Sequence, residues 1–240
     1  MCISIAADEG PQLEANHNPF AQEGEDLVFP VMKSPDGEAY FPKGKESYYT
    51  SYYRAATLPS MLHKREEDGN IRFRLAMFPS FSKPLFLTYS RGLDGASIEI
   101  TRLQLRWDDD ILHPVGIDLS GKVDIGNRIA ELLEEEVVRP RIRMPLSHLA
   151  EEHKQMFLGT DGTSYVIEVS TNTDYSFSSL WTPEGILGTK KIWEDLSQQN
   201  VEIDSLVDDL KKFIVFRDLL LDLVGLKEPR YTISELLDDG

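Results

Sequence analysis

Apolar residues alternate with polar or small ones in several short stretches, which is the pattern of half-buried β-strands. The pattern is clearest over residues 165–169 and 175–182, which follow the Asp161-Gly162 pair and are separated by a polar turn. An Asp-Gly pair and a short polar turn are typical of the ends of hairpin strands. These residues therefore predict a β-hairpin that ends at Pro183.

Three further strands are predicted from the same alternation, over residues 71–77, 85–89 and 98–107. In the third, the apolar positions are even-numbered up to Ile100 and odd-numbered from Leu103. A β-bulge near residues 101–102 would accommodate this change of phase. Residues 111–121 contain too much proline and glycine to form a regular element throughout.

Apolar residues at every third or fourth position predict four helices. They cover residues 125–137, 148–157, 187–196 and 203–224. The first follows Asp124 as its capping residue, and the last ends at Gly225, with Leu226 placed for the hydrophobic contact of a Schellman cap. Together with the strands, they predict an α+β fold: a twisted, mainly antiparallel sheet with the helices packed on one side.

Composition divides the chain into three parts. Residues 1–47 are rich in proline and acidic residues and are expected to form an extended N-terminal arm, residues 48–228 a single α+β domain, and residues 229–240 an acidic tail. The first seven residues fit either the end of a signal peptide or an ordinary chain start. This leaves the location open, with the periplasm or export favoured over the cytoplasm.

The formal net charge of -16 makes the surface strongly anionic. Because nucleic-acid binding depends on lysine and arginine neutralising phosphates, a nucleic-acid partner is not expected. A basic protein partner fits this charge, and so does solubility alone. The one cysteine, Cys2, excludes an internal disulfide, and no apolar run has the length of a transmembrane segment.

Four acidic residues are the candidates for chemistry. Asp94 and Asp161, or Glu99 and Glu168, would serve as acid and base in glycoside hydrolysis if the strands that follow the turns Asp94-Gly95 and Asp161-Gly162 belonged to neighbouring hairpins. The simpler interpretation is that both aspartates bind turn backbone and that both glutamates lie on the outward face of their strands.

Aromatic residues of the 165–182 hairpin are candidates for recognition. Tyr165, Tyr175 and Trp181 would form an exposed patch, although core packing is the commoner fate of such residues. The sequence has no phosphate loop, dinucleotide fingerprint or metal-ligand spacing, so no cofactor and no metal are predicted.

The order of these motifs resembles a loose group of uncharacterised, often exported bacterial proteins. The motifs that carry the resemblance are Ile71-Arg72-Phe73-Arg74-Leu75, Phe81-Ser82-Lys83-Pro84, Leu93-Asp94-Gly95, Leu146-Ser147, the strand from Asp161 to Glu168 and the tyrosine strand that ends in Trp181-Thr182-Pro183. This chain has Tyr165 where the group usually has tryptophan, and Ser179-Leu180 where the group usually has an arginine before the tryptophan. Some similar proteins act as immunity proteins against secreted toxins, so the resemblance implies a binding role.

The expected function is therefore that of a non-enzymatic binding protein of the bacterial envelope that acts through an acidic surface, with an inhibitor or immunity role as its specific form. Two alternatives stay open. One is a small periplasmic hydrolase that uses paired carboxylates, and the other is a structural element of a larger envelope assembly.

Overall fold

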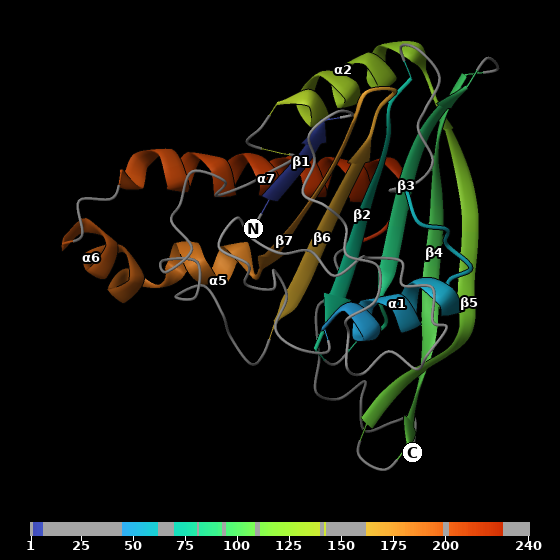
Figure 1. Ribbon diagram of the computed structural model, residues 1–240, viewed down its shortest axis with the longest axis horizontal. Coiled ribbons are helices and arrows are strands. Elements are labelled where there is room, and N and C mark those ends of the chain that lie inside the picture. Colours follow the sequence, from blue (N-terminus) through green and yellow to red (C-terminus); the bar gives the residue numbers. More distant parts are fainter. Residues whose placement is uncertain are drawn as a thin grey trace.

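The computed structural model describes residues 2–6, 45–61, 70–80, 82–92, 95–108, 111–139, 142, 162–198 and 202–227 (Figure 1). The predicted helix over 148–157 and the predicted tail over 229–240 lie outside the described residues. So do most of the predicted N-terminal arm and the candidate residues Asp94 and Asp161.

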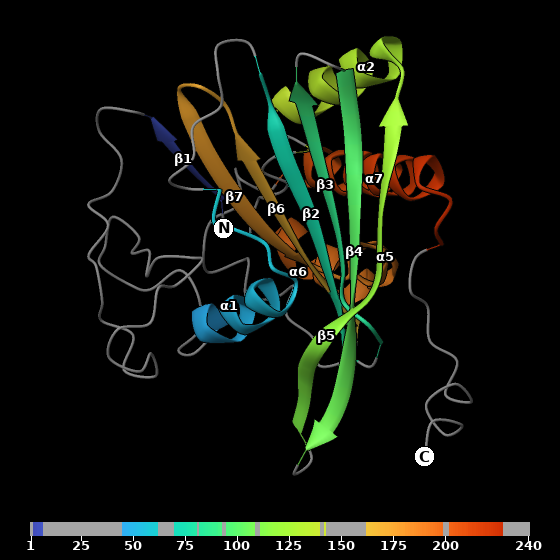
Figure 2. The same ribbon diagram turned by 90° about the vertical axis from the view of Figure 1, so that its right-hand side faces the viewer.

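The described strands form one antiparallel sheet, which confirms the predicted α+β fold. The strands are β1 (Cys2–Ala6), β2 (Arg72–Pro79), β3 (Leu85–Gly92), β4 (Gly95–Asp108), β5 (Ile111–Ile125), β6 (Thr163–Ser170) and β7 (Asp174–Trp181). Their order across the sheet is β1-β7-β6-β2-β3-β4-β5, as Figure 2 shows from left to right. The predicted hairpin of residues 165–182 is the β6–β7 pair, and β1 brings residues of the predicted arm into the sheet as an edge strand.

Strand β5 corrects the prediction that residues 111–121 are irregular. Proline lacks the N–H that a central strand needs, but an edge strand tolerates it, and β5 is at the edge of the sheet. The register with β4 shifts between Arg102 and Leu103 and again between Gln104 and Leu105, and the unpaired extra residues are Asp118 and Val115 of β5. The irregularity is thus next to the predicted bulge, but the inserted residues belong to the partner strand.

One face of the sheet is covered by α2 (Asn127–Val138), α5 (Pro183–Gly188), α6 (Lys190–Gln198) and α7 (Ile203–Leu223). Apolar residues of all four helices pack with those of the sheet in one core, and Phe213 and Phe216 of α7 meet Tyr165 and Phe73 of the strands. Asp124 belongs to β5, and Gly126 precedes α2, so Asp124 is not the helix cap that the sequence predicted.

The opposite face of the sheet is covered by α1 (Lys45–Ala55), a helix that was not predicted (Figure 1). Tyr49, Tyr52 and Tyr53 of α1 pack on Phe78 and Phe86 of the sheet in a second apolar core. This second core also explains the change of apolar phase in β4. The strand continues to alternate, but its apolar residues change from the face under α7 to the face under α1.

The end of α7 is the one predicted from the sequence. Gly225 has a φ of 69°, a conformation that glycine adopts without a Cβ penalty. The N–H of Leu226 donates to the carbonyl of Leu221 at 2.9 Å, the six-residue bond of a Schellman motif, and Leu226 packs against the core. The helix therefore stops before its predicted C-terminal glycine.

Candidate functional site

The two predicted glutamates lie on the same face and in the same cross-strand row of the sheet. Glu168 is opposite Arg74, Arg74 is opposite Thr88, Thr88 is opposite Glu99, and Glu99 is opposite Lys122. Three strand spacings of about 4.8 Å separate Glu168 from Glu99, or about 14 Å. A glycosidase needs its two carboxyl groups within about 5–9.5 Å, so this pair does not have the geometry of an acid and base.

Glu168 is buried, which corrects the expectation that it lies on an outward face. Its side chain is 0% exposed and that of Arg74 is 2% exposed. Arg74 Nη1 donates to Glu168 Oε2 at 3.0 Å, and the Tyr175 hydroxyl donates to Glu168 Oε1 at 3.0 Å. Glu168 is therefore the acceptor in a buried ion pair beneath α1, whereas Glu99 on the open part of the same face is exposed.

Arg74 is held on three further sides. Its Nε donates to the Thr88 hydroxyl at 3.2 Å, and its Nη1 donates to the Pro59 carbonyl at 3.2 Å. The guanidinium also lies 5.2 Å from the ring centroid of Tyr53. Because an ion pair removed from water is stable only when its remaining hydrogen-bonding groups are satisfied, this arrangement is typical of a structural pair. A polar position in the alternation of β2 marks Arg74 in the sequence, but its burial depends on α1, which was not predicted.

The three residues of the predicted aromatic patch do not lie together at the surface. Tyr165 belongs to the core under α7, and Tyr175 to the core under α1, so the two side chains lie on opposite faces of the sheet and both are buried. Trp181 is half-buried. Of the seven candidate residues, only Glu99 is an exposed side chain of a described residue, and the structure therefore brings no group of them together at the surface.

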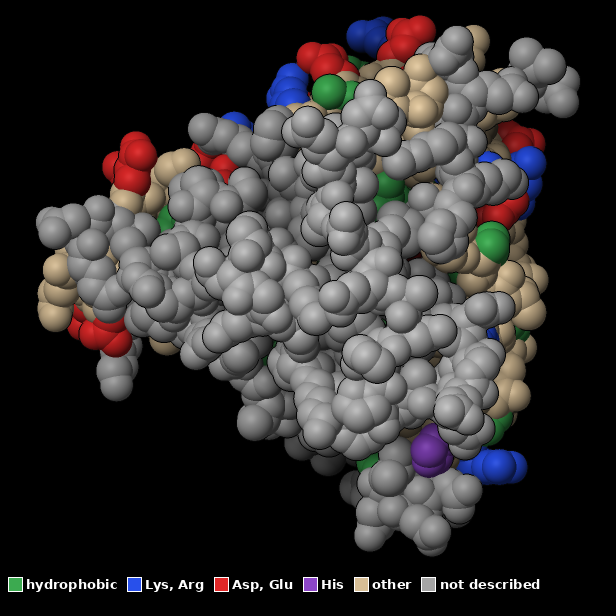
Figure 3. Space-filling view, viewed as in Figure 1, with side chains coloured by type: hydrophobic (Ala, Val, Ile, Leu, Met, Phe, Trp, Pro, Cys, Tyr) green, Lys and Arg blue, Asp and Glu red, His purple; other side chains and the backbone are tan. Residues whose placement is uncertain are grey.

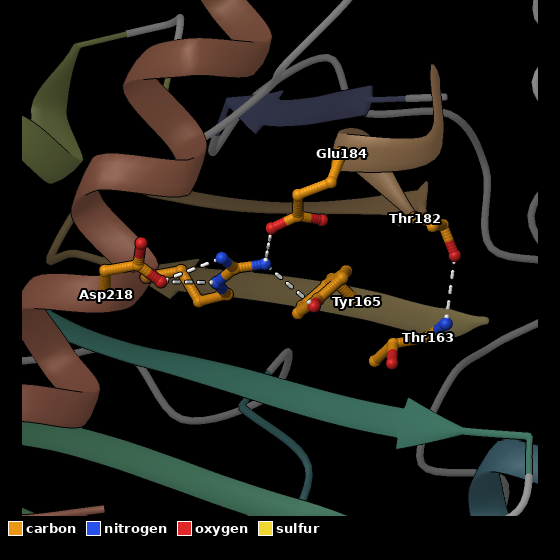
Figure 4. Close-up of polar contacts among 6 residues, drawn as sticks. Thr163, Tyr165, Thr182, Glu184 and Asp218 are labelled. Atoms are coloured by element: carbon orange, nitrogen blue, oxygen red, sulfur yellow. Dashed lines mark hydrogen bonds and ion pairs between the residues drawn. The ribbon is translucent and has the colours of Figure 1, made fainter. Parts of the chain in front are cut away.

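A second buried arginine, Arg217, ties α7 to the strands (Figure 4). Its Nη1 donates to the Tyr165 hydroxyl at 2.9 Å and forms an ion pair with Glu184 of α5, and its Nη2 donates to Asp218 at 2.8 Å. The guanidinium lies 5.5 Å from the Tyr165 ring centroid. Tyr165 of β6 therefore contacts the guanidinium of Arg217, which extends from α7 to the sheet. The sequence carried a signal for this contact, because Arg217 falls on the apolar side of the α7 pattern.

Tyr49 is buried on the side of α1 that faces the sheet, and its burial predicts a loss of stability at alkaline pH. Burial raises the pKa of Tyr49 from its ordinary 10.0 to about 12. The protonated form is therefore favoured by folding, so its contribution is complete below pH 10 and is lost as the pH rises towards 12. We expect Tyr49→Phe to reduce the alkaline slope of the free energy of unfolding by about 1.4 kcal/mol per pH unit in this range. Urea denaturation of the native chain and of Tyr49→Phe at a series of pH values measures this slope. Identical slopes for the two proteins would contradict the prediction.

The outer side of α7 carries an exposed surface that combines apolar and acidic side chains. We call it the α7 stripe: Asp204, Asp208, Lys211, Val215, Asp218, Leu219 and Asp222. At 100° per residue these positions lie within about 60° of one line along the helix. Val215 is 68% exposed and Leu219 is 40% exposed, and they lie one turn apart among four carboxylates and one lysine.

Several acidic side chains elsewhere among the described residues have cationic neighbours, as two of those in the α7 stripe do. Figure 3 shows carboxylates of described residues at several edges of the visible face. On α2, Glu134 pairs with Arg91 at 2.7 Å, and Glu135 and Glu136 both pair with Arg139. The α7 stripe contains one cation, Lys211. Beside the stripe, Lys212 pairs with Asp208 at 3.0 Å and Arg217 pairs with Asp218 at 2.8 Å. The stripe therefore combines exposed apolar side chains with an excess of negative charge.

The described residues contain no group of three or more side chains that would hold a metal ion and no helix long and apolar enough to cross a membrane. Of the two buried carboxylates among the described residues, Glu168 and Asp209, Glu168 accepts hydrogen bonds from Arg74 and Tyr175. Searches for similar proteins found no match among protein-family models, curated proteins or solved structures.

Proposed function

We propose that this chain is a non-enzymatic binding protein, of the inhibitor or immunity kind, that holds a basic protein through the α7 stripe. The observation that carries the proposal is the pair Val215 and Leu219, exposed side by side and flanked by Asp218 and Asp222. An apolar centre with a charged rim is the usual composition of a protein interface. The excess of carboxylates selects a partner with lysine or arginine at the matching positions.

Two further properties support this function. The net charge of -16 gives long-range attraction towards a basic partner, which accelerates association. The stripe is also on a rigid element, because the opposite side of α7 is buried along its length and Arg217 fixes it to β6. A preorganised surface binds at a lower entropic cost than a surface that must be ordered on binding.

The paired-carboxylate hydrolase has less support. Glu168 is bound by Arg74 and Tyr175, and Glu99 is about 14 Å away along the same row. The motifs of the sequence resemble those of a group of uncharacterised, often exported bacterial proteins, and some proteins of similar size and style are immunity proteins, which favours the binding function over catalysis.

The test is affinity capture from lysate and envelope fractions with two matched variants. The first changes the α7 stripe by Asp208→Asn, Val215→Ser and Asp222→Asn. The second makes the same kinds of change on α2, by Glu131→Gln, Leu132→Ser and Glu135→Gln, because Leu132 is also exposed and flanked by acids. We expect a basic protein that is captured by the native chain and by the α2 variant, and captured about tenfold less by the α7 variant.

Salt gives the second measurement of the same experiment. Attraction between exposed charges is screened over about 10 Å at moderate ionic strength, so high salt is expected to release the captured protein. Circular dichroism of both variants shows whether each one remains folded. Equal capture by the native chain and the folded α7 variant, or capture that does not respond to salt, contradicts the proposal.

A further inference from the structure

Strand β5 leaves one side of its backbone without a described neighbour. It is the last strand of the sheet among the described residues, and its other side pairs with β4 (Figure 2). Exposed edge strands pair readily with another strand, and proteins protect them with prolines, bulges and charges. In β5 the proline, Pro114, and both bulge residues, Val115 and Asp118, are in the first half of the strand. The second half, residues 119–125, pairs regularly with β4 and has neither a proline nor a bulge, and its charged residues are Lys122 and Asp124.

Charges alternate along the cross-strand row that ends at this edge. The row is Glu168, Arg74, Thr88, Glu99 and Lys122, with Lys122 as its outermost member. Lys122 is 60% exposed and Asp124, two residues further and on the same face, is 88% exposed. Asp124 is opposite Ser97 on β4, so its own cross-strand row has no cation, and it pairs along the strand with Lys122, at 4.0 Å between Nζ and Oδ1. A carboxylate beyond Lys122 and a cation beyond Asp124 would extend the alternation.

We propose that two copies of the chain join through β5, antiparallel and with Val123 at the two-fold axis. This register places Lys122 of each copy opposite Asp124 of the other, which gives two opposite-charge pairs across the joint. Each Lys122 then lies between Glu99 of its own copy and Asp124 of the second copy. Cross-strand pairs of this kind are favourable, and like charges in the same positions are unfavourable.

The other face of β5 also fits this register. Val123 and Ile125 are partly buried against the core under α7, and each would gain cover from a neighbouring strand. Ile125 would lie opposite Gly121 of the second copy, so a large side chain meets a position without one. Helix α2 follows β5 but lies above the strands rather than beyond β5 (Figure 2). The dimer would present two α7 stripes, and so would bind a multivalent partner more tightly than one copy does.

Disulfide trapping tests the register directly. In a Cys2→Ser background, which removes the single cysteine, Val123→Cys places two thiols across the axis at about 4.5–5.5 Å between Cα atoms. Ser120→Cys is the control on the same edge, because residue 120 of one copy would lie about 20 Å from residue 120 of the other. Mild oxidation with diamide is expected to cross-link the Val123→Cys protein and not the control. Equal cross-linking of both variants, or none in either, overturns the proposal.

A charge exchange tests the pairing in solution, with light scattering and sedimentation as readouts. We expect the native chain to have twice the mass of one copy, and Lys122→Asp to raise the dimer dissociation constant about tenfold or more, because both pairs become repulsive. Adding Asp124→Lys restores opposite charges across the joint and is expected to restore the dimer. Glu99 faces the introduced aspartate in both variants. The exchange also restores the ion pair between residues 122 and 124 within one strand, which is 4.0 Å long in the native chain, so only the dimer dissociation constant reports the contact between copies. A monomeric native chain, or a dimer that is unaffected by Lys122→Asp, contradicts the inference.

Discussion

Replacing Arg74 by methionine is expected to lower the free energy of unfolding by about 3–5 kcal/mol. The substitution leaves the carboxylate of Glu168 in the protein interior without its cation. Glu168 is fully buried, and without Arg74 it keeps the hydrogen bond from the Tyr175 hydroxyl but loses the positive charge beside it. A buried charge without compensation is among the most destabilising consequences of a single substitution. Urea denaturation followed by circular dichroism measures the change.

The matched control removes both charges. In the double variant Arg74→Met and Glu168→Leu neither charge of the pair remains, and replacement of a buried pair by apolar residues of similar volume is often neutral or stabilising. We expect the double variant to recover most of the lost stability. A loss in the single variant below about 1 kcal/mol, the usual value for an exposed pair, would show that the pair is in contact with water.

Substitution of Gly162 by alanine has the second large effect, a loss of about 3 kcal/mol or more. Gly162 has a φ of 147°, and an added Cβ would lie 1.9 Å from the Thr182 hydroxyl oxygen. That hydroxyl cannot move freely, because it accepts a hydrogen bond from the Thr163 N–H at 3.0 Å (Figure 4). Thr182 itself has a φ of 30°, so the backbone there is already in an uncommon conformation.

The variant Gly95→Ala is a control that has the backbone strain of a positive φ without the collision of an added Cβ. Its φ of 126° is similarly unusual, but no atom lies within 4 Å of an added Cβ. Gly95→Ala is therefore expected to cost about 1–2 kcal/mol, the strain alone. If Gly162→Ala and Gly95→Ala lose the same stability in thermal or urea unfolding, then collision with Thr182 does not add to the cost at Gly162, and the prediction is contradicted.

Strands and helices with a single buried face were predictable from the sequence. The α7 helix has an uninterrupted apolar side and a glycine at its end, and both the helix and its Schellman cap follow from these residues. The β6–β7 hairpin similarly follows from alternation and turn residues. In each case the local pattern and the tertiary contacts lead to the same structure.

Residues that are buried by a second layer were not predictable in the same way. Aromatic residues have modest helix propensity, so the run from Tyr48 to Arg54 gave no helix prediction, although Tyr49, Tyr52, Tyr53 and Ala56 have helical spacing. Without α1, the polar positions of β2 and β6 were assigned to solvent, and Glu168 was expected to be exposed. The edge position of β5 is also a tertiary property, so its proline and glycines were interpreted as irregular structure.

The candidate site shows the same limit. Alternation identifies Tyr165 and Tyr175 as hairpin residues but cannot show that two different layers cover them. The α7 stripe is the outward complement of a buried helix face, so its positions were implicit in the predicted helix. Which carboxylates have cationic neighbours from other elements, as Glu134 of α2 has Arg91 of β3, depends on tertiary contacts that the helical pattern does not give.

The most direct test of the binding function is calorimetric titration of the captured partner into the native chain and into the folded α7 and α2 variants, at low and high salt. We predict that the native chain and the α2 variant bind alike, that the α7 variant binds about tenfold more weakly, and that salt weakens binding to the native chain. If the α7 variant binds as tightly as the native chain, or if the α2 variant alone loses binding, the α7 stripe is not the site at which this protein holds its partner.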